Sequence, residues 1–360
     1  MENNLKYKYP TELSDFSRTL DEKVNAYFKE RNISKNANFH TACKGILWFS
    51  LLIISYAIIM SDRLSSYWLI VAFVAHGFAQ LFMTYNISHD ANHGAYSANP
   101  KINLSLSYTF DLVGINSYIW RLLHNTSHHS FINVKGKDSA ITSNSLLRFS
   151  PHEKFSPLHK YQYLYAPIAY TLSTLYWVLT KDFYCFFSKK TYGNKVIEKH
   201  ETKELIILIL TKLFYYTYML LLPIMFLSEA WYVIVLGFLI MHAFIGFHIA
   251  LIFQPCHIND DSAYPQADKS GHLSNDFVSH VFSTTCDYSR KKTFTTWMLG
   301  GLNLHIIHHM YPNICHIHYP ALTEILIETA EEFGYKYREH KDVKVAFTAH
   351  LSSLKTLGNA

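Results

Sequence analysis

Four long apolar runs alternate with polar segments along this chain. The runs cover residues 46–60, 67–86, 205–227 and 231–253, and each is close to the ~20 residues that a helix needs to cross ~30 Å of hydrocarbon. The turn SDRLSS separates the first two runs and the turn SEA separates the last two. Neither turn is long enough for a domain, so the pattern predicts two helical hairpins with four membrane-spanning helices.

The polar segments contain further helical patterns. Apolar residues recur every three or four positions between residues 13 and 28, which is typical of an amphipathic helix that lies on a membrane or packs on another domain. Two weaker apolar stretches, 102–120 and 163–187, are rich in Tyr and interrupted by polar residues. We interpret them as helices in the membrane interface or along a substrate channel. A last helix is expected between Pro320 and Gly334.

These elements predict an all-α integral membrane protein that forms a single domain over residues 1–360. Its expected parts are an amphipathic N-terminal segment (1–42), a first hairpin (45–86), a loop (87–203), a second hairpin (204–253) and a C-terminal region (254–360). Interfacial helices and a cytosolic helical cap would complete the fold. No cleaved signal peptide is expected, because the first residues contain neither a short apolar core nor an A-x-A site.

Composition and charge agree with a membrane location. The chain is 49% hydrophobic and 16% charged, whereas about a quarter of a soluble protein is charged. The net charge of +5 comes without a Lys/Arg stripe, so nucleic acid is not expected as a partner.

Only Arg63 lies in the two short turns and only Lys212 lies within a span. The positive-inside rule therefore places segments 1–42, 87–203 and 254–360 on the cytoplasmic side. Five scattered cysteines without CxxC predict neither a disulfide framework nor a thiolate metal site.

Three histidine clusters lie in these cytoplasmic segments. They are an HxxxH (His89, His93), an HxxxHH (His124, His128, His129) and an HxxHH (His305, His308, His309). Spacings of three and four place side chains on one face of a helix. We expect the eight imidazoles to converge on one metal centre, with four or five ligands for each of two ions. Imidazole suits iron, zinc, copper and nickel, and spacing alone does not separate iron from zinc.

A metal-free histidine patch, a metal transporter and an inactive scaffold are alternative explanations of these clusters. HxxxH is expected about once by chance in a chain with 22 His, but HxxHH and HxxxHH are each expected only ~0.08 times. A metal-free histidine patch at the membrane surface would not need such repeats. A divalent-metal transporter would need polar residues near the middle of the bilayer, and the clusters lie outside the spans. A membrane scaffold without activity explains the clusters least.

Several longer stretches resemble the membrane fatty acid desaturases, in particular the bacterial linoleoyl-CoA desaturase-like and front-end acyl desaturases. The resemblance covers almost the whole chain and is carried by HDANHGAYS, WRLLHNTSHHSFINVKGKD, FQPCHIND, GGLNLHIIHHMYPNICHIHYPAL and ETAEEFGYKY. It implies a non-haem enzyme with two Fe²⁺ ions that uses O₂ and two electrons from an external donor. Such an enzyme removes two hydrogens from a long acyl chain and leaves a cis double bond.

The resemblance also implies which residues bind the metals. The three clusters correspond to the family's ligand boxes, and a ninth ligand corresponds best to His257, with His280 as a weaker alternative. Neighbouring Asp90, Asn92, Asn125, Asp138 and Asn303 are candidates to orient the imidazoles, since metal-bound His usually needs such partners. For any one of them a helix cap or turn is an equal alternative.

Two departures from the family pattern limit this resemblance. Front-end desaturases commonly begin the third box with Gln where this chain has His305, so the position of the double bond is left open. No HPGG haem motif of a fused cytochrome b5 domain occurs, so a separate ferredoxin or cytochrome b5 is the expected donor.

A hydroxylase or ketolase with the same histidine boxes is the alternative function. The acyl carrier could be CoA, a carrier protein or a membrane lipid. The resemblance implies a multi-pass protein of the bacterial cytoplasmic membrane or of the endoplasmic reticulum, with the active site on the cytoplasmic face.

Overall fold

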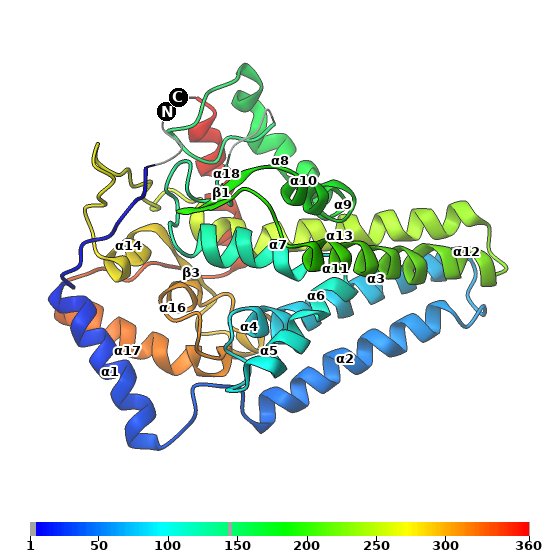
Figure 1. The fold of residues 1–360 in the computed structure, drawn as a ribbon, viewed down its shortest axis with the longest axis horizontal. Helices are drawn as coiled ribbons and strands as arrows, with labels where there is room; N and C mark the ends of the chain where they lie inside the picture. Colours follow the sequence, from blue (N-terminus) through cyan, green and yellow to red (C-terminus); the bar gives the residue numbers. More distant parts are fainter. Residues whose placement is uncertain (1–4, 143–145, 360) are drawn as a thin grey trace.

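The computed structural model describes residues 5–142 and 146–359, most of which lie in helices (Figure 1). Residues 1–4, 143–145 and 360, which belong to the predicted N-terminal, loop and C-terminal segments, lie outside the described residues. In chain order the α-helices are α1 (Asp15–Arg31), α2 (Phe39–Ile59), α3 (Ser66–Met83), α4 (His89–Asn92), α5 (Pro100–Ser107), α6 (Thr109–Leu112), α7 (Ser117–Arg121), α8 (Gln162–Thr171), α9 (Ser173–Tyr176), α10 (Asp182–Phe187), α11 (Thr202–Tyr216), α12 (Leu222–Phe226), α13 (Trp231–His257), α14 (Phe277–Thr284), α15 (Thr293–Met298), α16 (His305–Met310), α17 (Tyr319–Glu332) and α18 (Val343–Leu357).

Shorter turns and strands complete the described fold. The π-helical turns are Thr84–Ser88, Leu122–His128, Trp177–Lys181 and Thr217–Leu221, and the 3-10 turns are Pro157–Tyr161 and His316–His318. Strand β1 (Lys190–Tyr192) pairs antiparallel with β2 (Lys195–Ile197), and β3 (Asp287–Tyr288) pairs parallel with β4 (Glu339–His340). The fold is therefore mostly helical, and the strict all-α prediction was wrong for these short sheets. They form where extended connecting segments run side by side and pair their backbone groups.

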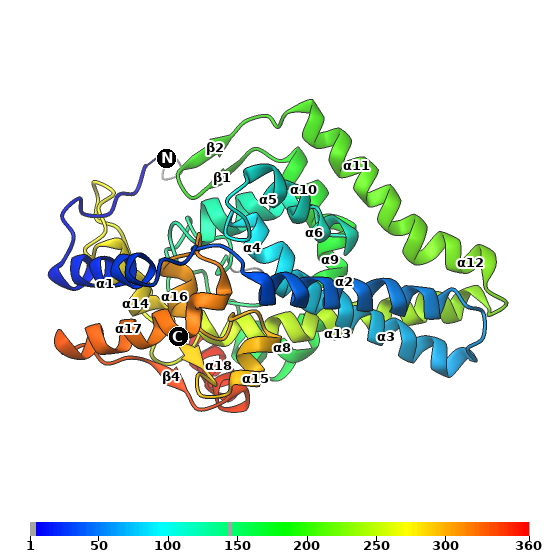
Figure 2. The same cartoon turned by 90° about the horizontal axis from the view of Figure 1, so that it is seen from below.

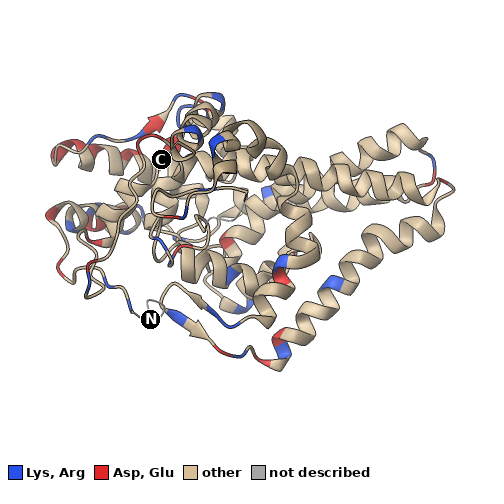
Figure 3. Ribbon diagram, turned by 90° about the horizontal axis from the view of Figure 1, so that it is seen from above, with Lys and Arg blue, Asp and Glu red and all other residues tan. Residues whose placement is uncertain are grey.

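Four helical stretches are long and apolar enough to cross a membrane. They are Phe39–Ile59, Ser66–Asn92, Thr202–Phe226 and Trp231–His257. The second and fourth run beyond their predicted ends at residues 86 and 253, and each ends at a histidine-bearing segment. Figures 1 and 2 show both hairpin turns at one end of the molecule and the histidine-bearing helices α4 and α16 toward the other. Figure 3 shows that charged residues are sparse along these helices.

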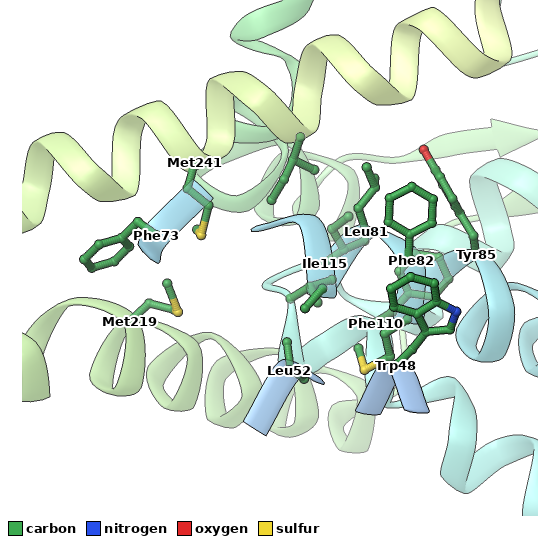
Figure 4. Close-up of a cluster of buried hydrophobic side chains, with 14 of the residues drawn as sticks. Trp48, Leu52, Phe73, Leu81, Phe82, Tyr85, Phe110, Ile115, Met219 and Met241 are labelled. Atoms are coloured by element: carbon green, nitrogen blue, oxygen red, sulfur yellow. The ribbon is translucent and has the colours of Figure 1, made fainter. Parts of the chain in front are cut away.

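The spans pack together through a large apolar core. Trp48, Phe73, Phe110, Met219 and Met241 belong to this cluster, and each has less than a tenth of its surface exposed (Figure 4). The opposite faces of α2 and α11 expose large apolar side chains such as Ile46, Ile53 and Leu210. An apolar stripe that faces outward on a long helix is suited to contact with lipid tails.

The N-terminal amphipathic helix packs on the protein. Phe16, Leu20, Val24 and Phe28 of α1 are buried in a second core that includes residues of α14, α16 and α17. The structure thus decides between the two alternatives for this helix in favour of packing. The helix expected after Pro320 is α17, which begins at Tyr319. The placement of α5–α10 in a membrane interface stays a prediction.

Candidate metal centre

The first histidine pair is positioned by the end of a long apolar helix that is a candidate membrane span. Helix α3 continues through the π-helical turn Thr84–Ser88 into α4, so His89 and His93 lie at the end of one continuous element. Their ring centroids are 4.8 Å apart. Because the spacing is one helical turn, both imidazoles leave the helix on the same side.

The second cluster depends on a π-helical turn. His129 donates its backbone N–H to the carbonyl of His124 at 2.8 Å, which is an i→i+5 hydrogen bond. The wider turn brings position i+5 to the side of the helix that position i+4 would face in an α-helix, and π turns are frequent at functional sites. As a result, the Nε2 atoms of His124 and His129 are 3.0 Å apart.

The third cluster follows a tight glycine turn. Gly300 and Gly301 have φ angles of +59° and +71°, a region that favours glycine. A Cβ on Gly300 would lie 2.5 Å from the carbonyl oxygen of Tyr85, so glycine is also required there by space. Asp287 accepts the backbone N–H of Ile306 at 2.8 Å and so holds the start of α16. This turn directs His305, His308 and His309 toward the two upstream clusters.

The ninth predicted ligand is also brought to the same place. His257 is the last residue of α13, and its Nε2 lies 3.1 Å from Nε2 of His309. The alternative, His280, instead places its Nε2 2.8 Å from the carbonyl oxygen of Ile132. His280 belongs to none of the histidine groups that could hold a metal ion within the described residues.

Eight of the nine histidines of the three boxes and α13 form two adjoining groups, and the ninth lies between them. One group contains His89, His93, His124 and His308, and the other contains His128, His257, His305 and His309; within each, the ligand atoms lie within 4.8 Å of one another. His129 forms a further group with His308 and His309, and thus connects the first two. Each of the nine histidines comes from a segment that the sequence singled out.

Partners on the far side of the rings set the orientation of several imidazoles. Nδ1 of His128 lies 3.0 Å from both oxygens of Asp138, and Nδ1 of His305 lies 3.0 Å from the carbonyl oxygen of Leu302. Since a carboxylate and a carbonyl only accept, these Nδ1 atoms carry the proton and Nε2 presents its lone pair. This is the arrangement that metal-bound histidine requires.

Of the five predicted orienting residues, Asp138 alone hydrogen-bonds directly to one of the nine rings within the described chain. Asp90 lies 3.9 Å from Nδ1 of His89 and is hydrogen-bonded to Nδ1 of His316 at 2.7 Å. Asn92 and Asn303 donate to the backbone carbonyls of Ser88 and Tyr288. The remaining candidate, Asn125, donates to the carbonyl of Asn92. Asn125 thus ties the second histidine segment to the first, whereas Asn92 and Asn303 bond to backbone closer in sequence.

Sequence reasoning missed two neighbours of the histidines. The hydroxyl of Tyr319 lies 3.1 Å from Nδ1 of His308. The indole of Trp120 stacks on His124 with ring centroids 4.1 Å apart, and it also contacts His89 and His93 at 5.7 and 5.8 Å. Both residues lie within motifs that the sequence analysis quoted, but no spacing rule connects an aromatic ring with a ligand from another segment.

Burial keeps these imidazoles neutral at physiological pH. Desolvation lowers the pKa of His305 to about 3. It also lowers the pKa of the following histidines well below the usual value: His93, His124, His129, His308 and His309. A neutral imidazole is the form that binds metal ions.

The geometry fits two metal ions. Metal–nitrogen bonds to histidine are about 2.0–2.1 Å long, which places neighbouring ligand nitrogens at right angles about 3.0 Å apart. The Nε2 separations of 3.0 and 3.1 Å within the site match this spacing. Moreover, Nε2 of His89, His93 and His308 is buried and has no hydrogen-bond partner among the described residues. Buried polar atoms are normally paired, so these nitrogens need a cation or another partner.

Comparisons with known proteins agree with the geometry. The chain is 30% identical to an sn-1 linoleoyl-lipid 6-desaturase of Synechocystis sp., over 97% of either chain. It is 29% identical to the enzyme of the same name from Arthrospira platensis, over 95% of this chain and 92% of that one. It is also 29% identical to an acyl-lipid (8-3)-desaturase of Physcomitrium patens, over 96% of this chain and 72% of that one. The sequence profile of the fatty acid desaturases matches residues 65–341. The chain therefore belongs to the fatty acid desaturase family of oxidoreductases.

Proposed function

We propose that the chain is a membrane-bound acyl-lipid desaturase that holds two iron ions with nine histidines. The single observation that carries this proposal is the convergence of nine histidines, eight in two adjoining groups and His129 between them. The nine are His89, His93, His124, His128, His129, His257, His305, His308 and His309. Nitrogen ligands without carboxylates or thiolates suit iron, and two adjoining ions suit O₂ chemistry. The names of the relatives, which act on acyl groups of lipids, support a long-chain lipid substrate.

The reaction removes two hydrogens from neighbouring methylenes of the acyl chain. With O₂, two electrons and two protons, it leaves a cis double bond and two water molecules. The bound irons would supply the oxidising power for breaking unactivated C–H bonds. The protein's own share is to hold the ligand nitrogens, keep water out and fix one C–C bond at the centre.

Specific residues account for that share. Asp138 and Leu302 hold the rings of His128 and His305 in the tautomer that presents Nε2 to the ions. Trp120 covers the side of the first group, where it contacts three of the four imidazoles. Because the centre lies at the ends of α3 and α13, an acyl chain held among the spans can reach it from the membrane.

Within the family we propose the front-end class. The sn-1 linoleoyl-lipid 6-desaturases and the acyl-lipid (8-3)-desaturase support this choice by name. His305 replaces the Gln that is common at this position, and its Nε2 lies 3.1 Å from Nε2 of His309, at ligand spacing. A separate electron donor and a location in the membrane with the centre on the cytoplasmic face complete the proposal.

The test is fatty acid profiling of a host that expresses the chain and is fed several acyl chains. We expect new unsaturated fatty acids with the added double bond between an existing one and the carboxyl end. The His308→Ala variant should give none while still inserting into the membrane. Hydroxylated products would support the alternative hydroxylase, and an unchanged profile with iron-loaded protein would contradict the proposal.

A further inference from the structure

A solvent-open pocket of about 620 Å³ reaches the histidine centre from outside the spans. His129 and His309 form part of its lining, together with residues of the N-terminal segment 5–10, the second histidine segment and the β1–β2 hairpin. No residue of α2, α3, α11, α12 or α13 lines it. The pocket is therefore a route to the metal ligands that does not pass through the membrane-spanning part of the protein.

The wall of this pocket is held in place by specific contacts. The ring of Tyr9 stacks on Phe131 with centroids 5.9 Å apart and an interplanar angle of 9°, and its hydroxyl donates to the carbonyl of Ser130 at 3.0 Å. The side-chain oxygen of Asn194 accepts the backbone N–H of Tyr7 at 2.9 Å, and its amide donates to the carbonyl of Tyr7 at 2.7 Å. The N-terminal segment 5–10 is thus fixed beside the β1–β2 hairpin turn, and the opening is a built feature of the fold.

Positive charge predominates on the surface around the opening, although the exposed Glu198 follows the β1–β2 hairpin directly. Segments 5–10, 125–137 and 190–197 contain six lysines and neither Asp nor Glu. The lysines are Lys6, Lys8, Lys135, Lys137, Lys190 and Lys195. Lys6, Lys8, Lys135 and Lys195 are exposed. Within the described residues, the side chains of Lys6, Lys8 and Lys195 make no hydrogen bond or ion pair. A surface with an excess of one sign of charge attracts partners of the opposite sign and raises their association rate.

We propose that this basic opening is the docking surface for a small acidic protein that carries one electron, such as an iron–sulfur or haem protein. The inference rests on the proposed function, which needs two electrons in each turnover. Two reduced carriers would dock in succession, each would be oxidised by one electron, and the electrons would enter through the rings of His129 and His309. Together with two protons and the two hydrogens of the substrate, they complete the reduction of O₂ to two waters.

The residues that line the pocket favour an electron-carrier protein over an acyl lipid as its occupant. An acyl chain in a membrane would have to pass between spanning helices, and none of these helices contributes a wall. An electron needs only close approach to the edge of a ligand ring. Complementary charge affects mainly the association rate, so the docking step should depend strongly on ionic strength.

The test compares two triple variants of the iron-loaded protein in detergent. Lys6→Glu/Lys8→Glu/Lys195→Glu reverses the proposed surface, and Lys29→Glu/Lys341→Glu/Lys344→Glu makes the same charge change at exposed lysines elsewhere. Anaerobic stopped-flow mixing with a reduced plant-type ferredoxin, or with the reduced haem domain of cytochrome b5, gives the second-order rate constant for electron transfer. A second measurement reduces each protein fully with dithionite, admits O₂ and quantifies the unsaturated product of one turnover.

We expect the first variant to lower the rate constant about tenfold or more at low salt, with the difference disappearing at about 0.5 M salt. The control variant should stay within about twofold of the wild type, and all three proteins should give equal product after dithionite. An unchanged rate constant in the first variant, no electron transfer from either carrier to the wild type, or a raised KM for the acyl lipid alone would overturn the docking surface. Absence of product from dithionite-reduced wild type would instead overturn the proposed function.

Discussion

His128 and Asp138 form the most direct contact between a ligand ring and a carboxylate in the centre. The ring donates its Nδ1 proton to a carboxylate whose two oxygens are both 3.0 Å away. The same carboxylate accepts the backbone N–H of Asn133 at 2.9 Å and of Ala140 at 2.8 Å. The loop after the second histidine cluster is thus folded around the group that orients one of its ligands.

Replacing Asp138 by Asn should weaken iron binding about 10- to 100-fold, the usual effect of losing such an orienting partner. The amide oxygen can still accept one backbone N–H, so the loop should keep its fold. Anaerobic equilibrium dialysis against Fe²⁺ gives the affinity. Asp260→Asn, at an exposed position, is the matched control. Equal affinity in both variants would show that the carboxylate does not support the site.

His257 lies in one of the histidine groups and His280 does not, and two alanine variants can test the proposed ninth ligand. His257→Ala removes a nitrogen from the second group and should lower both bound iron and product at least tenfold. His280→Ala removes only a hydrogen bond to the carbonyl of Ile132, so its iron content should stay near that of the wild type. Iron analysis and single-turnover product yields of the two variants test this expectation. A larger loss of iron and product in His280→Ala than in His257→Ala would make His280 the ninth ligand.

The local patterns in the sequence predicted the spans and the three histidine boxes, because both depend on helical spacing within one segment. The boxes converge as expected because helices α3 and α13 end close together beside α16. The resemblance to known desaturases ranked His257 ahead of His280, a choice that the residues alone did not make. In the structure, α13 continues past its apolar run and through Pro255 to place His257 at the centre.

Contacts between distant segments could not be predicted in this way. Nothing in the spacing of HNTSHH indicates that its helix widens into a π turn, which allows His129 to face His124. Tyr319 meets His308 only because α17 packs beside α16. The short sheets have the same origin, since their strands pair through the tertiary arrangement of connecting segments.

Truncation of Trp120 should loosen the first group of ligands. The indole is buried against His124, His89 and His93, so Trp120→Ala should leave a cavity and destabilise the protein by about 3–5 kcal/mol. Trp120→Phe, which keeps a ring at this position, should lose less. Thermal unfolding in detergent measures the stability of both Trp120 variants, with Trp231→Ala at an exposed position as the control. Equal unfolding temperatures for all variants would mean that Trp120 does not brace the site.

A buried ion pair links helices α10 and α11. Nζ of Lys212 lies 2.8 Å from Asp182, and the carboxylate also accepts the backbone N–H of Asn116 at 2.9 Å. Lys212→Met leaves a buried charge without its partner, which should cost about 3–5 kcal/mol of stability. Adding Asp182→Asn removes that charge and should recover part of the loss. Chemical unfolding of both variants tests this; a double variant no more stable than the single one would contradict it.

The buried histidines should make the protein sensitive to acid. An unfolded histidine has a pKa of about 6.5, whereas burial lowers the pKa of His305 to about 3 in the folded state. Below pH 6.5 the unfolded chain therefore binds protons that the folded chain does not, so stability is full above that pH and falls as the pH is lowered. Each such imidazole contributes ~1.4 kcal/mol for each pH unit.

Unfolding of the metal-free protein between pH 8 and pH 5 measures this effect. We expect a plateau above about pH 7 and a steep loss below it, with a shallower loss in His305→Gln, which removes one of the titrating groups. A protein that became more stable as the pH fell toward 5 would show that these imidazoles are protonated in the fold.

The central claim is that the nine histidines hold two irons within one site. Iron quantification combined with Mössbauer spectroscopy on ⁵⁷Fe-loaded protein tests this claim most directly. The account predicts two irons per chain, both in nitrogen-rich environments, and the loss of bound iron in His308→Ala. A wild-type protein that binds no iron, or one iron that His308→Ala retains, would contradict it.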